Sequence, residues 1–132
     1  MLTKRGCIMH LHLWLETKEG MFFGPGRAEL LERVEYHGSL LKAADELGMS
    51  YRAAWGKIKK TEAVLGCKLI EKSGSYRTGY RLTNYGRQLA EKFRLWYSDV
   101  EEDALQKART VFGVPVERQE EKGLRPEHCP DV

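Results

Sequence analysis

The chain has 132 residues, of which 42% are hydrophobic and 31% charged, with a formal net charge of +3 and a pI near 8.8. This length corresponds to about one domain, and the composition is typical of a folded globular protein, which excludes a disordered chain. No segment approaches the roughly 18 apolar residues of a membrane span, and the three cysteines are widely spaced. We therefore expect a cytoplasmic protein in a reducing compartment.

The N-terminal part predicts a β-hairpin over residues 8–23. Residues 8–15 alternate leucine with histidine or tryptophan, which is the period of a half-buried strand. A turn around Gly20 reverses the chain, and residues 21–23 return as the second strand.

Three helices are predicted next, over residues 26–37, 39–47 and 50–65, from the spacing of their apolar residues. Ser39 and Ser50 are suitable N-caps for the second and third of them. Two short helices joined by a tight turn that contains a glycine form a helix-turn-helix.

The C-terminal half predicts a basic hairpin and one long helix. Residues 68–82 are expected to form two strands with a flexible tip, and Thr83 can cap a helix over residues 83–112, about 45 Å long. Its apolar stripe is longer than a small domain can cover, so we expect a homodimer. The predicted dimer interface consists of Leu89, Phe93, Trp96, Val100, Leu105 and Ala108.

The predicted fold class is mainly α with small β elements (α+β), namely a winged helix-turn-helix with an N-terminal β-hairpin and a long C-terminal dimerisation helix. The DNA-binding domain is expected to occupy residues 1–112. Residues 113–132 hold three prolines and mostly polar residues, which predicts a disordered acidic tail.

The positive charge lies in the middle of the chain. Residues 1–49, 50–98 and 99–132 carry net charges of −1, +8 and −4. A concentrated basic block is typical of a surface that binds a polyanion such as double-stranded DNA, although solvated lysines give a milder version of the same pattern.

The third helix is the candidate recognition helix. Arg52 can read guanine with two hydrogen bonds, and Tyr51 or Trp55 can contact thymine methyl groups in the major groove. The lysines of this helix suit phosphates, and Arg77 of the hairpin tip can enter the minor groove. The alternatives are that Trp55 is a core residue, the lysines a solvated face and the tip a mobile polar loop. The predicted DNA-binding residues are Ser39, Ser50, Tyr51, Arg52, Ala53, Trp55, Gly56, Lys57, Lys59, Lys60, Ser75, Tyr76, Arg77, Thr78 and Arg81.

Four motifs resemble a known family. They are Gly26-Arg27-x-x-Leu30-Leu31, Gly38-Ser39-Leu40 through Ala43-Ala44, Gly48-Met49-Ser50-Tyr51-Arg52-x-Ala54-Trp55, and Leu82-Thr83-x-Tyr85-Gly86-Arg87-x-Leu89. Over about residues 8–98 the chain is similar to the DNA-binding domain of the molybdate-responsive ModE regulators and, more distantly, to the LysR-type winged helix. The resemblance implies a prokaryotic, dimeric transcription regulator whose third helix enters the major groove.

Two departures from that family stand out. ModE regulators sense molybdate or tungstate in a C-terminal oxyanion-binding domain, and the 20-residue tail is too short to form one, so we expect no oxyanion cofactor. Thr61 replaces a larger apolar residue, and the wing is less rich in glycine. Whether a separate regulatory partner supplies a signal stays open.

Other functions were weighed against this interpretation. Cys7, His10 and His12 suggest a metal- or redox-responsive regulator, but strand alternation separates the cysteine from the two histidines, so no metal site is expected. A winged helix that binds protein is the other alternative. The sequence contains no phosphate-binding loop, nucleophile elbow or His-Glu-x-x-His motif, and we expect no enzyme.

Overall fold

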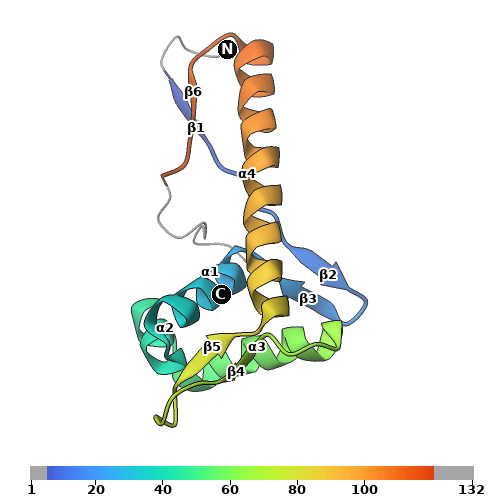
Figure 1. Cartoon of the computed structure of the whole chain (residues 1–132). Coiled ribbons are helices and arrows are strands. Elements are labelled where there is room, and N and C mark those ends of the chain that lie inside the picture. Colours follow the sequence, from blue (N-terminus) through green and yellow to red (C-terminus); the bar gives the residue numbers. More distant parts are fainter. Residues whose placement is uncertain (1–5, 121–132) are drawn as a thin grey trace.

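Residues 6–120 are described by a computed structural model, in which four helices and six short strands follow one another (Figure 1). The fold is mainly helical with three two-stranded sheets in this part of the chain, and it contains the predicted helix-turn-helix and two-stranded wing. The elements are β1 (Cys7–Met9), β2 (Leu15–Thr17), β3 (Gly20–Phe23), α1 (Pro25–His37), α2 (Leu40–Glu46), α3 (Tyr51–Leu65), β4 (Ile70–Lys72), β5 (Tyr80–Leu82), α4 (Asn84–Phe112) and β6 (Val116–Arg118).

Local capping chemistry sets where three of the helices begin. The hydroxyl of Ser39 accepts from the backbone N–H of Lys42 at 3.2 Å, and that of Ser50 from Ala53 at 3.0 Å. Thr83 caps α4 in the same way through Gly86. These bonds satisfy amides that a helix N-terminus leaves without a partner. The three predicted N-caps are therefore confirmed.

Helix α1 lies at the centre of the core. Its residues Leu30, Leu31 and Val34 are buried, and the helix packs against α2, α4 and β5. Phe23 at the end of β3 meets Phe93 of α4 edge to face, with 5.2 Å between ring centroids. The core therefore holds the helix-turn-helix and the base of α4 together, while the rest of α4 extends beyond it (Figure 1).

The predicted hairpin over residues 8–23 is only partly correct. Strands β2 and β3 do pair antiparallel, but β1 instead pairs in parallel with β6, with Ile8 opposite Glu117. Between β1 and β2 the chain crosses α4, where Leu11 packs on the core and its carbonyl accepts from the hydroxyl of Tyr97. Residues 10–14 belong to no strand, so the alternating segment is divided between β1 and β2.

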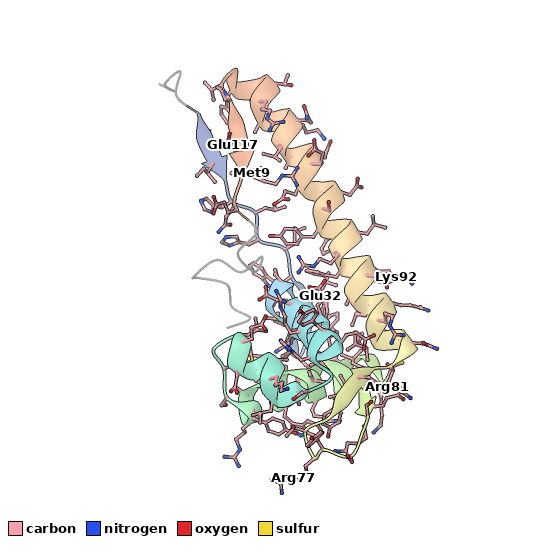
Figure 2. The ribbon with its side chains drawn as sticks, turned by 60° about the vertical axis from the view of Figure 1, so that its left-hand side comes forward. Met9, Glu32, Arg77, Arg81, Lys92 and Glu117 are labelled. Carbon is pink, nitrogen blue, oxygen red and sulfur yellow. The ribbon has the colours of Figure 1, made fainter. Side chains whose placement is uncertain are left out.

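The expectation of a disordered tail is wrong for residues 116–118. These residues form β6 beside the distal half of α4, as Figures 1 and 2 show near Met9 and Glu117. Val116 is buried, its carbonyl accepts from the Arg109 side chain at 2.8 Å, and Arg118 forms ion pairs with Glu101 and Glu102. One charged residue of the predicted tail, Arg118, is thus paired with α4. Residues 121–132 of the predicted tail lie outside the described residues.

No helix within residues 6–120 combines the length and the apolar character that crossing a membrane requires.

Candidate nucleic-acid interface

The N-terminal half of α3 presents a polar face to solvent. Ala54, Ile58 and Thr61 point into the core, which leaves Arg52, Ala53 and Gly56 exposed. Because side chains on a helix repeat every 3.6 residues, the buried set fixes which residues face outward. This exposed face is the one predicted to read DNA.

The wing, residues 68–82, lies beside this end of α3. Its tip, residues 73–79, carries Arg77 at the end of the molecule opposite to Met9 and Glu117 (Figure 2). Backbone contacts hold the tip against the turn between α1 and α2. The amide of Leu40 donates to the carbonyl of Thr78 at 3.0 Å, the amide of Tyr80 donates to Gly38, and Ser39 bridges Gly79. The tip is therefore anchored at its C-terminal side.

A groove of about 700 Å³ separates α3 from the wing. It brings together five of the predicted residues, from two elements that are distant in sequence, and adds three that the sequence analysis did not single out. The predicted residues are Tyr51, Arg52, Trp55, Arg77 and Thr78, and the additional ones are Leu41, Lys72 and Tyr80.

The three additional residues have different explanations. Leu41 escaped prediction because the apolar stripe of the second helix runs through other positions and leaves this leucine exposed on the outside. Lys72 and Tyr80 belong to the predicted hairpin. Successive side chains of a strand point to opposite faces, and this period could have shown which hairpin residues face α3.

Trp55 lies between the two alternatives weighed for it. It is half-buried, its ring centroid lies 5.8 Å from that of Tyr80, and it still lines the groove. The ammonium of Lys59 lies 4.3 Å from the centroid of the Trp55 ring, a cation–π distance. Trp55 is therefore both a packing residue and part of the groove wall.

Two of the lysines predicted to contact phosphates, Lys59 and Lys60, lie near other groups of the protein. Lys59 also pairs with Glu62 at 2.9 Å, and Lys57 is half-buried. Lys60 points at the β2–β3 hairpin, with its Nζ 3.7 Å from the place that a Cβ on Gly20 would occupy. None of these three lysines lines the groove. Arg81 pairs with Glu71 on the neighbouring strand at 2.9 Å, on the side of the wing toward α4 (Figure 2).

The remaining predicted residues fall into two groups. Ser39 and Ser50 are engaged as N-caps, so their hydroxyls already accept a hydrogen bond. Ser75 and Tyr76 are exposed on the wing tip beside Arg77.

Two ionisable groups at the interface have shifted pKa values. Burial raises the pKa of Tyr51 above its usual value, and its hydrogen bond with Tyr80 adds to the shift. Tyr51 therefore remains a neutral hydrogen-bond donor at pH 7. Burial alone would raise the pKa of Glu62, but hydrogen bonds from the Leu69 amide and Lys59 outweigh it and hold the pKa below its usual range. Glu62 is thus an anion that joins α3 to the foot of the wing.

Buried Thr61 has a structural role that the sequence did not reveal. Its hydroxyl donates to the backbone carbonyl of Phe22. A larger apolar residue at this position would leave that carbonyl without this donor, so the threonine connects the β2–β3 hairpin to α3.

The predicted dimer stripe is only partly open. Phe93 lies in the core and Leu105 is also buried, so the expectation that a single chain exposes them is wrong. Leu89, Val100 and Ala108 are half-buried, and Trp96 is exposed. The sequence could not show that β6 and the segment after β1 cover part of α4. The large exposed apolar residues of α4 are Tyr85, Leu95, Trp96, Val111 and Phe112.

Within residues 6–120, no group of three or more histidine, cysteine, aspartate or glutamate side chains is close enough to hold a metal ion. Cys7 lies on β1, whereas His10 and His12 follow it as exposed residues outside any strand.

Comparison with known proteins identifies the helix-turn-helix region. Residues 26–87 match the family described as bacterial regulatory helix-turn-helix protein, lysR family. The DNA-binding transcriptional dual regulator ModE of Escherichia coli is 31% identical over 85 residues, which is 63% of this chain and 32% of ModE. The molybdenum-pterin-binding protein MopA of Rhodobacter capsulatus is 35% identical over 91 residues, 67% of this chain and 32% of MopA. The chain thus spans about a third of the length of these relatives.

Solved structures share the fold. The CbnR DBD–DNA complex superposes with a TM-score of 0.54 at 22% identity, covering 67% of this chain and 98% of the other. The BenM DBD complex with benA site 1 DNA gives 0.54 at 21% identity, covering 69% and 99%. These domains correspond to the part of the chain that contains the winged helix-turn-helix.

Proposed function

We propose that this protein binds specific DNA sequences as a homodimer. The premise is that residues 26–87 form a LysR-type helix-turn-helix domain of a DNA-binding transcription regulator. The family match confirms the resemblance drawn from the sequence motifs, and it is to a family of regulators, not of enzymes. In the proposed complex the N-terminal half of α3 enters the major groove. The wing tip then lies on the backbone or in the minor groove.

The groove between α3 and the wing is the observation that carries this proposal. Arg52 stands on α3 and Arg77 on the wing tip, so two guanidinium groups border one groove with aromatic walls. Arginine suits guanine edges in the major groove and phosphates or the narrow minor groove equally well. Apolar walls suit thymine methyl groups and deoxyribose.

The homodimer is proposed from the exposed side of α4. Leu95 and Val111 are each about three-quarters exposed, and Trp96 and Phe112 are exposed on the same helix. Large apolar side chains exposed at several points along one helix supply apolar area that a second copy of the chain could bury. A dimer would present two α3 helices to half-sites one helical turn apart, or a multiple of it. Light scattering at micromolar concentration tests this, and a monomeric mass contradicts it.

Residues 6–120 are proposed to supply DNA binding and assembly, and not oxyanion sensing. The names of the relatives refer to molybdenum transport and molybdenum-pterin binding, but this chain matches only about a third of those proteins. Titration of the protein with molybdate, followed by calorimetry, should give no heat of binding.

Selection from a random DNA pool, followed by sequencing at two salt concentrations, tests the proposal. We expect enrichment of an inverted repeat at both concentrations. Salt-sensitive binding without enrichment would indicate phosphate attraction alone and would refute sequence-specific regulation. Absence of DNA binding would favour the alternative of a winged helix that binds protein.

A further inference from the structure

Lys72, the last residue of β4, directs its charge into the wing. Its ammonium donates to the backbone carbonyl oxygens of Tyr76 at 3.1 Å and of Arg77 at 2.6 Å. It also lies 5.0 Å from the centroid of the Tyr80 ring. Three of the groups around this ammonium therefore belong to the wing itself.

The same residue stands at one end of a stack that reaches α3. Tyr80 contacts Trp55, and Trp55 lies beneath the ammonium of Lys59. Lys59 pairs with Glu62. The carboxylate of Glu62 accepts a hydrogen bond of 2.7 Å from the backbone amide of Leu69, the residue before β4. A continuous series of contacts thus runs from the wing tip to α3 and from α3 to the residue that precedes β4.

The wing tip is a tight turn that needs such support. A Cβ on Gly79 would lie 2.2 Å from the carbonyl oxygen of Ser73, so only glycine fits there without a shift of the backbone. The amide of Gly79 donates to the carbonyl of Tyr76, and that of Ser73 to Gly79. The Lys72 ammonium binds the Tyr76 carbonyl as well as that of Arg77, and so holds together two of the residues whose side chains are exposed at the tip.

We propose that Lys72 is a positioning residue for DNA binding, which fixes the wing tip relative to α3 and does not itself contact phosphate. The proposal rests on the proposed function, because it concerns how Arg77 is held opposite Arg52 across the groove. A wing already ordered in the free protein loses less conformational freedom on binding DNA. Lys72 therefore contributes to affinity without adding a contact to the nucleic acid.

The first test uses the free protein, so it does not depend on DNA binding. In Lys72→Met the alkyl chain remains while the charge and donors are lost. Amide hydrogen exchange of Ser73 and Gly79 should become at least tenfold faster, while the core amides of α1 keep their wild-type rates. Lys72→Arg, which retains the donors, should restore slow exchange. Unchanged exchange of Ser73 and Gly79 in Lys72→Met would overturn the proposal.

The second test measures the slope of log K against log salt concentration for wild type and variant. Loss of one phosphate contact lowers the magnitude of this slope by about 0.9, whereas loss of a positioning residue weakens binding and leaves the slope unchanged. Lys68→Met, which removes an exposed charge close to β4, is the matched control. A slope reduced by about 0.9 in Lys72→Met would overturn the proposal. If wild type binds no DNA, the proposed function fails, and amide exchange still decides whether Lys72 orders the wing.

Discussion

Gly86, in the first turn of α4, allows the long helix to begin directly on the wing. A Cβ at this position would lie 2.2 Å from the carbonyl oxygen of Leu69 and 3.0 Å from its carbonyl carbon. That carbonyl also accepts the amide of Thr83, and the Thr83 hydroxyl donates to Lys68 at 2.7 Å. A Cβ at this position would push the start of α4 away from Leu69, but the hydrogen bonds of Thr83 hold the two segments together.

The magnitude of Gly86→Ala follows from two opposing effects. Alanine favours a helix over glycine by about 1 kcal/mol. The clash with the backbone of Leu69 forces a shift that costs roughly 1–3 kcal/mol for ordinary overpacking, and a contact of 2.2 Å with a bonded carbonyl places this substitution at or above the upper end. We expect a net loss of about 2 kcal/mol in the free energy of unfolding.

Urea unfolding followed by circular dichroism measures this loss, and Gly56→Ala is the matched control. Gly56 lies within α3, is exposed, and has nothing within 4 Å of the place where a Cβ would stand. The same substitution there should stabilise the protein by about 0.5–1 kcal/mol. We expect the urea midpoint to fall in Gly86→Ala and to rise in Gly56→Ala. A shift in the same direction in both variants would contradict the argument that the close approach to Leu69 requires glycine at position 86.

Three further outcomes follow from individual contacts. Glu62→Gln should lower the free energy of unfolding by about 1.5–3 kcal/mol at pH 7. Because the pKa of Glu62 is lowered in the folded protein, this difference is present above the unfolded pKa of about 4.3 and should vanish as the pH falls through the folded pKa. Urea titrations from pH 7 to 3 measure it. Thr61→Val should cost about 1–2 kcal/mol, because the carbonyl of Phe22 loses its donor; an unchanged urea midpoint contradicts this. Arg52→Ala should reduce discrimination at one base position by roughly 1–3 kcal/mol in the selection experiment; an unchanged sequence preference means that another residue reads that base.

Local chemistry was readable from the sequence because it involves residues close together in the chain. Ser39 and Ser50 each bond an amide three residues ahead, so their types and places were enough to predict where the helices begin. The same holds for Gly38, which ends α1 with φ of +65°. The order of helix-turn-helix and wing followed from these boundaries together with the apolar spacing.

Pairings between distant segments were not readable. Cys7 pairs with Val116 across more than a hundred residues, and each strand has only three residues, too few for a periodic signal. Burial of Leu105 depends on elements that no local pattern relates to it. Alternation within residues 8–15 predicted one strand because the pattern does not show that the two ends of this segment pair with different partners, β6 and β3.

The direction of the basic side chains also depends on tertiary contacts. It determines how many of the clustered positive charges are available to DNA phosphates. Eleven lysines and arginines lie between residues 50 and 98, but at least four of them pair with carboxylates of the protein and a fifth donates to backbone carbonyls. Those with described internal partners are Lys59 with Glu62, Lys72 with the wing carbonyls, Arg81 with Glu71, Arg87 with Glu35, and Arg94 with Glu32.

A salt titration distinguishes the full charge count from the geometry. If all eleven basic residues contacted phosphates, log K would fall with log salt at a slope of about −10 per protomer. Arg52 and Arg77, which line the groove, predict about −2 when each neutralises one phosphate. We expect a value much closer to the second, measured by fluorescence anisotropy on one operator-length duplex from 50 to 300 mM salt. A slope near −10 per protomer would mean that the internal ion pairs open on DNA, and that the groove is not the main contact surface.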